Sequence, residues 1–97
     1  MSLRFYRSGK TKLIQFSQYE YKVSLEELLH QVKSGTQDVY KLLNRYSGWL
    51  SSQGLRPKTT IDYVVAAKKL LRHEDILILN ELFHEKVSLP KPEEIHV

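Results

Sequence analysis

Lysine and arginine are the side chains whose number and spacing point most clearly to chemistry in this sequence, namely the binding of anions. The chain of 97 residues has a net charge of +4, but that charge is unevenly spread. Residues 33–73 hold eight basic and two acidic side chains, a local charge of +6. Residues 1–12 add four bases and no acid, whereas residues 74–97 hold six acids and two bases. The central segment is therefore expected to face an anionic partner, and the acidic C-terminal part masks it in the total.

Residues suited to catalysis or metal binding do not form a recognisable set. The chain has no cysteine and its four glycines are isolated, which excludes thiolate metal sites and a glycine loop for phosphate. The histidines lack metal-ligand spacing, and the pair Glu81 and His84 is too few for a site. Tyr46 and Tyr63 fall on apolar stripes, where a structural role explains them better than a nucleophilic one. We therefore predict a binding module that is not an enzyme and uses no metal or cofactor.

The elements that position the basic residues are expected to be helices, because apolar side chains recur at helical spacing. Ser24 and Glu27 form a capping box at the start of the first predicted helix. Pro57 suits the first turn of another helix, and Asn80 is expected to cap a short one. The predicted helices span residues 24–33, 36–53, 57–72 and 80–86.

Two of these helices carry apolar stripes that would pack on each other. The stripe of helix 36–53 comprises Val39, Leu42, Leu43, Tyr46, Trp49 and Leu50. The stripe of helix 57–72 comprises Thr60, Tyr63, Val64, Ala67, Leu70 and Leu71. Basic side chains lie opposite both stripes, so the helices would share one core and turn their charged faces outward. We predict an all-α fold, a small helical bundle of about four helices with an extended N-terminal arm.

The two ends of the chain are expected to lie outside this bundle. Residues 1–23 are predicted to form a basic arm or a short strand, because tyrosines alternate with charged residues near their end. Residues 24–89 would form the helical domain, and residues 90–97, which begin with Pro-Lys-Pro, would start a stiff linker. No apolar run reaches the length of a membrane span and no signal peptide is visible, so we expect a cytoplasmic protein with no membrane partner.

Duplex DNA is the anionic partner that this arrangement favours. Lysine and arginine on outer helix faces would neutralise phosphates and release counterions. The start of helix 57–72 would anchor a phosphate, and Val65 would contact a thymine methyl group. The residues predicted to contact DNA are Lys41, Arg45, Arg56, Lys58, Thr59, Val65, Lys68, Lys69 and Arg72. The alternatives are a basic face that meets an acidic protein, and charged side chains that only interact with solvent.

The segment Gly54-Leu-Arg-Pro-Lys-Thr-Thr-Ile-Asp-Tyr63 resembles the run Gly-Leu-Ser-Pro-x-Thr-Ile-x-x-Tyr of a known family. That family is the core-binding, SAM-like N-terminal domain of tyrosine recombinases, the phage-type integrases. The preceding helix, over residues 43–50, resembles the family's Tyr-x-x-Tyr-Leu-x-x-Leu. Residues 81–92 are similar to the end of that domain in archaeal-type integrases. The resemblance spans about residues 36–92.

This resemblance implies a SAM-like bundle that grips duplex DNA as part of a site-specific recombinase. The family's catalytic residues belong to a downstream domain, so no tyrosine of this chain is expected to be catalytic. The implied partners are double-stranded DNA, the catalytic domain of the same parent chain, and further copies in a tetrameric synapse. The alternative is a helical regulator or excision factor that binds DNA alone. Arg56 replaces the usual Ser cap and Thr60 replaces an aliphatic residue, which predicts a weaker cap and packing shifted toward Ile61.

Overall fold

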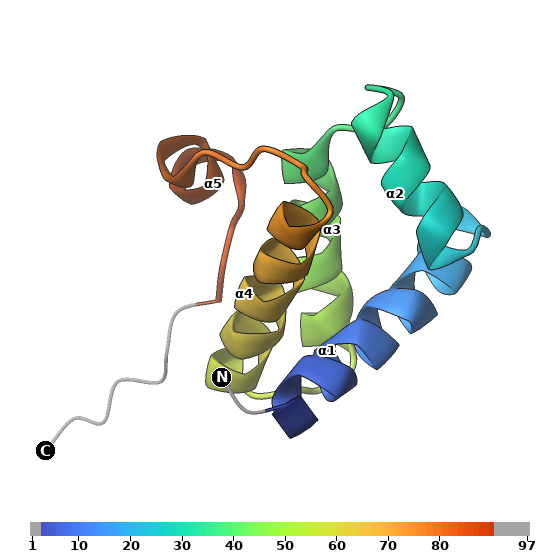
Figure 1. Ribbon diagram of the computed structural model, residues 1–97. Helices are drawn as coiled ribbons and strands as arrows, with labels where there is room; N and C mark the ends of the chain where they lie inside the picture. Colours follow the sequence, from blue (N-terminus) through green and yellow to red (C-terminus); the bar gives the residue numbers. More distant parts are fainter. Residues whose placement is uncertain (1–2, 91–97) are drawn as a thin grey trace, which may run out of the picture.

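All the elements in the described part of the computed structural model are helices (Figure 1). The structure describes residues 3–90, with side chains from residue 7 onward. The elements are α1 (Leu3–Phe16), the π-helix η1 (Ser17–Tyr21), α2 (Leu25–Lys33), α3 (Val39–Ser52), α4 (Pro57–His73) and α5 (Asn80–Lys86). The predicted all-α fold is confirmed, with five α-helices over these residues where about four were expected. Most of the predicted linker, residues 91–97, lies outside the described residues.

The N-terminal segment is helical where an extended arm or a short strand was expected. Gly9, Leu13 and Phe16 are all buried on one face of α1. Their i, i+4, i+7 spacing is a helical stripe, which the basic residues around it obscured. Gly9 allows close packing, because a Cβ atom there would lie only 3.1 Å from the Cβ atom of Ala66 in α4. Residues 3–21 therefore belong to the bundle instead of projecting from it.

The turn from α1 into α2 is built around η1. Lys22 ends the π-helix with a left-handed φ of 61°. The hydroxyl of Ser17 donates a hydrogen bond to the carbonyl of Val23 (2.8 Å). The hydroxyl of Ser24 accepts a bond from the amide of Glu27 (3.2 Å), which confirms the Ser24 half of the predicted capping box, whereas the Glu27 carboxylate accepts a bond from the side-chain amide of Gln31 (3.4 Å). These hydrogen bonds thus fix the path of the backbone between α1 and α2.

α3 and α4 lie side by side and supply much of the core (Figure 1). α3 begins after Asp38, slightly later than predicted, because the Asp38 carboxylate accepts bonds from the amides of Tyr40 and Lys41. The two predicted stripes face the core; Trp49 and Tyr63 are partly buried, and the other stripe residues are buried. The packing shift expected around residue 61 does not occur, since Thr60 is fully buried and keeps its place on the stripe.

The segment after α4 folds back along α3. Ile76 and Ile78 are buried, and α5 packs on α3. The hydroxyl of Ser47 donates a bond to the carbonyl of Ser88 (3.0 Å), and the amide of Ser88 donates one to the side-chain oxygen of Asn44 (2.8 Å). These bonds fasten the chain after α5 to the middle of α3. None of the helices within residues 3–90 is long and apolar enough to span a lipid bilayer.

Candidate nucleic-acid interface

The nine residues predicted to contact DNA fall into two groups on two neighbouring helices. Residues 56–72 belong to α4 and its start, whereas Lys41 and Arg45 lie on α3. Both helices turn apolar stripes to the shared core, so the basic groups opposite those stripes point away from it. The Arg45 guanidinium lies 3.7 Å from the Glu20 carboxylate, which places it beside η1. The structure therefore does not assemble one surface from all nine.

The outer face of α4 presents two available cations. Lys58, Val65 and Lys69 are spaced i, i+7, i+11, which keeps them on one line along the helix. Both lysines are exposed and Val65 is half-buried. Within residues 7–90, neither lysine side chain makes a hydrogen bond or an ion pair. Asp62 is exposed on the same face and partly offsets their charge.

The start of α4 adds backbone donors to this face. Arg56 precedes the helix and its side chain makes no capping bond, so the predicted weak cap is confirmed. The first helical hydrogen bond in this turn runs from the Thr60 amide to the Arg56 carbonyl (2.9 Å). The amides of Lys58 and Thr59 therefore have no partner within the helix. The positive end of the helix dipole lies at this turn, next to the exposed Arg56 and Lys58 side chains.

Lys68 and Arg72 hold α5 in place. The Lys68 ammonium donates a hydrogen bond to the side-chain oxygen of Asn80 (2.5 Å) and lies 4.5 Å from the centre of the Phe83 ring. The Arg72 guanidinium donates to the Ile78 carbonyl (2.8 Å) and to the same Asn80 oxygen (3.4 Å). Burial, together with the neighbouring charge of Arg72, lowers the pKa of Lys68. Both cations thus have a structural role that the sequence did not reveal.

Asn80 differs from its predicted role as a helix cap. It is the first residue of α5, and the residue before it, Leu79, makes no side-chain capping bond. Its side-chain oxygen is instead taken by two donors from α4, Lys68 and Arg72. These donors lie four residues apart and so share one flank of α4. Two basic residues four positions apart near the end of a helix, followed after the next turn by a polar residue such as Asn80, are the sequence signal that could have predicted this contact.

Sequence reasoning missed a second surface, formed by aromatic side chains beside α1. Tyr19 of η1 is 64% exposed, and its ring centre lies 6.4 Å from that of Trp49 in α3. The Lys12 ammonium lies 5.9 Å from the Trp49 ring centre. Burial raises the pKa of the neighbouring Tyr21, against the opposing effect of Arg45. No sequence signal marked this cluster, because it depends on the helical path of residues that were expected to form an arm.

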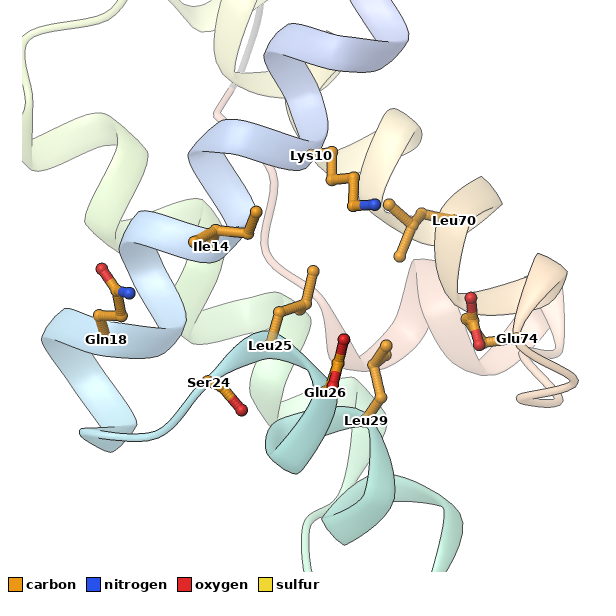
Figure 2. A pocket seen from close by; sticks show the side chains of 9 residues that line it. All are labelled: Lys10, Ile14, Gln18, Ser24, Leu25, Glu26, Leu29, Leu70 and Glu74. Carbon is orange, nitrogen blue, oxygen red and sulfur yellow. The ribbon is translucent and has the colours of Figure 1, made fainter.

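A cavity of about 630 Å³ lies between α1, α2 and α4. Figure 2 shows the aliphatic side chains of Ile14, Leu25 and Leu29 turned toward it, with Lys10 and Glu74 near its edge. Acidic and basic groups share this edge, so the cavity offers no consistent charge to an anionic polymer. It therefore lies apart from the α4 face in both position and chemistry.

Metal-binding side chains do not cluster in the part of the chain that the structure describes, where no group of three His, Cys, Asp or Glu residues could hold an ion. Comparisons with known protein families, with curated proteins and with solved structures find no match to this chain.

Proposed function

We propose that this protein is a duplex DNA-binding module that grips the phosphate backbone with the outer face of α4. The observation that carries the proposal is the pair of exposed lysines, Lys58 and Lys69, without a side-chain partner within residues 7–90. Two such cations on one line of an outward-facing helix are suited to phosphates, whose neutralisation releases counterions. The uncapped start of α4 supports the same partner, since phosphate accepts bonds from free helix amides.

The dimensions of α4 suit a groove of B-DNA. Lys69 lies eleven positions after Lys58, so their Cα atoms are about 16 Å apart along the helix. The major groove is about 12 Å wide and admits one α-helix. Val65, which lies between the two lysines, would then face the base edges, where an apolar group recognises the methyl group of thymine. Lys68 and Arg72 would contribute mainly by holding α5 beside this face.

The resemblance over residues 36–92 makes this proposal more specific. We propose that the module serves as the core-binding domain of a tyrosine recombinase in the cytoplasm, binding part of a recombination site. The chemistry would come from a catalytic domain of the same parent chain, and tetramer assembly on DNA would follow the family's pattern. A helical regulator that binds DNA alone would use the same α4 face, so the face and its test do not depend on that choice.

A titration of a fluorescently labelled duplex across a salt series tests this function. We expect binding that weakens steeply with salt, and that strengthens in Asp62→Asn because the acid on the α4 face is removed. Polyglutamate provides the comparison for an acidic protein partner. Binding to polyglutamate as tight as to the duplex, or no duplex binding at about 50 mM salt, would reject DNA as the partner.

A further inference from the structure

Tyr19, Trp49, Lys12 and Tyr63 form a strip of aromatic and basic side chains, which we call the aromatic strip. It lies on α1, η1 and the adjoining sides of α3 and α4. Its residues take no part in the α4 face described above. A Tyr side chain that is 64% exposed needs an explanation, because aromatic rings usually bury most of their surface in a core or at an interface.

The inner side of the Trp49 ring packs against buried aromatic rings. Its ring stacks on the buried Tyr46 ring (6.1 Å between centres, 18° between planes) and packs against the buried Phe16 ring (5.6 Å). The outward-facing part of Trp49 is therefore a fixed surface. Tyr19 lies beside it at 6.4 Å, with an angle of 37° between the ring planes.

The backbone of η1 is what turns Tyr19 outward. Phe16 and Ser17 are buried, whereas the next three residues of the π-helix are exposed. π-Helices are rare and occur frequently at functional sites. The following residue, Lys22, has a left-handed φ of 61°, which is uncommon outside glycine. An unusual backbone path thus accompanies the exposed ring.

Positive charge accompanies these rings. Lys12 lies 5.9 Å from the Trp49 ring centre and also lines a shallow hollow of about 320 Å³. Arg7 and Tyr63 line the same hollow, and none of its lining residues is acidic. Glu20, the acid next to Tyr19 in the sequence, is paired with Arg45 at 3.7 Å. A phosphate in the hollow would therefore meet cations, within reach of the aromatic rings.

We infer that the aromatic strip binds unpaired nucleotides of single-stranded nucleic acid. Exposed aromatic rings stack on bases of any sequence, and neighbouring cations bind the phosphates between them. The bases of a duplex are stacked on each other and cannot lie against Tyr19 and Trp49. The strip therefore selects single strands, whereas the α4 face is suited to a duplex.

Trp49 is the single tryptophan of the chain, so its fluorescence reports directly on this site. We expect a short oligothymidylate to quench this fluorescence saturably. Tyr19→Leu keeps an apolar side chain and removes the ring, and should weaken binding about tenfold. Tyr19→Phe should bind like the unaltered protein, because it keeps the stacking surface. Lys12→Gln should weaken binding and reduce its dependence on salt.

Two controls isolate stacking from charge. Leu77→Ala removes another exposed apolar side chain (76% exposed), far from the strip in the sequence, and should leave quenching unchanged. An abasic oligodeoxyribose phosphate carries the charge without the bases and should bind more weakly than oligothymidylate. Oligouridylate and oligodeoxyuridylate differ only in the sugar: tighter binding of oligouridylate identifies RNA as the preferred strand, and tighter binding of oligodeoxyuridylate identifies DNA.

The inference is overturned if oligothymidylate causes no saturable quenching, if Tyr19→Leu binds it as tightly as the unaltered protein, or if the abasic strand binds equally well. Circular dichroism establishes that each variant is folded. Lys58→Ala with Lys69→Ala should weaken duplex binding while oligothymidylate still quenches Trp49. Failure of the proposed duplex function is thereby distinguished from failure of the aromatic strip.

Discussion

Tyr46 has a buried hydroxyl group with no hydrogen-bond partner among the described residues. Its ring packs against the rings of Phe16 and Trp49, so the stabilisation comes from the ring and not from the hydroxyl. Burial, together with the nearby Tyr63, raises the pKa of Tyr46 well above its usual value. An unpartnered buried hydroxyl carries a desolvation cost that phenylalanine would avoid.

We predict that Tyr46→Phe raises the free energy of unfolding at neutral pH by about 1 kcal/mol. Above about pH 10 the unfolded state releases the Tyr46 proton while the folded state retains it, so stability falls as pH rises. This loss amounts to about 1.4 kcal/mol per pH unit and should be absent from Tyr46→Phe. Urea unfolding at neutral and alkaline pH measures both effects.

Tyr40 is the matched control for this prediction. Its hydroxyl accepts a hydrogen bond from the Leu79 amide (3.1 Å), so Tyr40→Phe should lower stability by about 1 kcal/mol. If Tyr46→Phe destabilised the protein as much as Tyr40→Phe, the Tyr46 hydroxyl would have to make a stabilising interaction.

At the level of the elements, α1 packs closely on α4 at Gly9. A Cβ atom added to Gly9 would lie 3.1 Å from the Cβ atom of Ala66, tighter than ordinary van der Waals contact, so Ala66 would have to yield by a few tenths of an ångström. Gly48, in α3, is exposed and has nothing within 4 Å of the same added atom. Alanine at Gly48 therefore tests helix propensity alone, whereas alanine at Gly9 tests helix propensity together with the packing of α1 on α4.

We predict that Gly48→Ala raises the free energy of unfolding by about 0.5–1 kcal/mol, because alanine favours the helix. Gly9→Ala should show none of this gain, since the packing of α1 on α4 offsets it. Thermal and urea unfolding of both variants provide the comparison. Equal gains would mean that α1 and α4 are not in close contact at this point.

The hydrogen bonds from Lys68 and Arg72 to Asn80, which we call the clamp between α4 and α5, give a second prediction. Asn80→Ala removes the acceptor that Lys68 and Arg72 share and should lower stability by about 1 kcal/mol. Asn80→Asp places a negative charge between these two cations and near the start of α5, so it should raise stability. Hydrogen exchange of the α5 amides should slow in Asn80→Asp and accelerate in Asn80→Ala. An aspartate variant no more stable than the alanine variant would contradict the clamp.

Four helices were predictable from the sequence, α3 and α4 from their apolar periods and α2 and α5 from the residues at their ends, whereas α1 and η1 were not. α3 and α4 have stripes of large residues at helical spacing, and both stripes face the core. α1 escaped prediction because part of its buried face is Gly9, whose contact with Ala66 depends on tertiary packing. η1 escaped because alternation of tyrosines with charged residues mimics a strand.

The candidate site was predictable to a similar extent. Lys58 and Lys69 follow from helical spacing, since both lie opposite the buried stripe of α4. Lys68 and Arg72 were expected to face DNA because the contact with Asn80 joins two elements, and helical spacing within α4 contains no information about it. The same reason hid the aromatic strip, whose rings come from η1 and α3.

At the scale of the whole molecule, the basic charge is divided among several places. Lys58 and Lys69 face outward from α4, Lys68 and Arg72 fasten α5, and Arg45 of α3 lies beside Glu20 of η1. The local charge of +6 over residues 33–73 is therefore not one binding surface. The affinity for duplex DNA should therefore depend on where a basic side chain lies, and not only on the net charge of the protein.

The slope of duplex affinity against salt concentration tests this claim most directly. Each phosphate contact contributes about 0.9 to the slope of log affinity against log salt. Lys58→Ala with Lys69→Ala should therefore reduce the slope by about two units. Lys10→Ala with Lys33→Ala removes the same charge from α1 and α2, at residues that are not on the outer face of α4, and should leave the slope nearly unchanged; of these two, Lys33 already lies 3.7 Å from the Glu74 carboxylate. An equal reduction in both double variants, or no reduction in the first, would contradict the assignment of the α4 face.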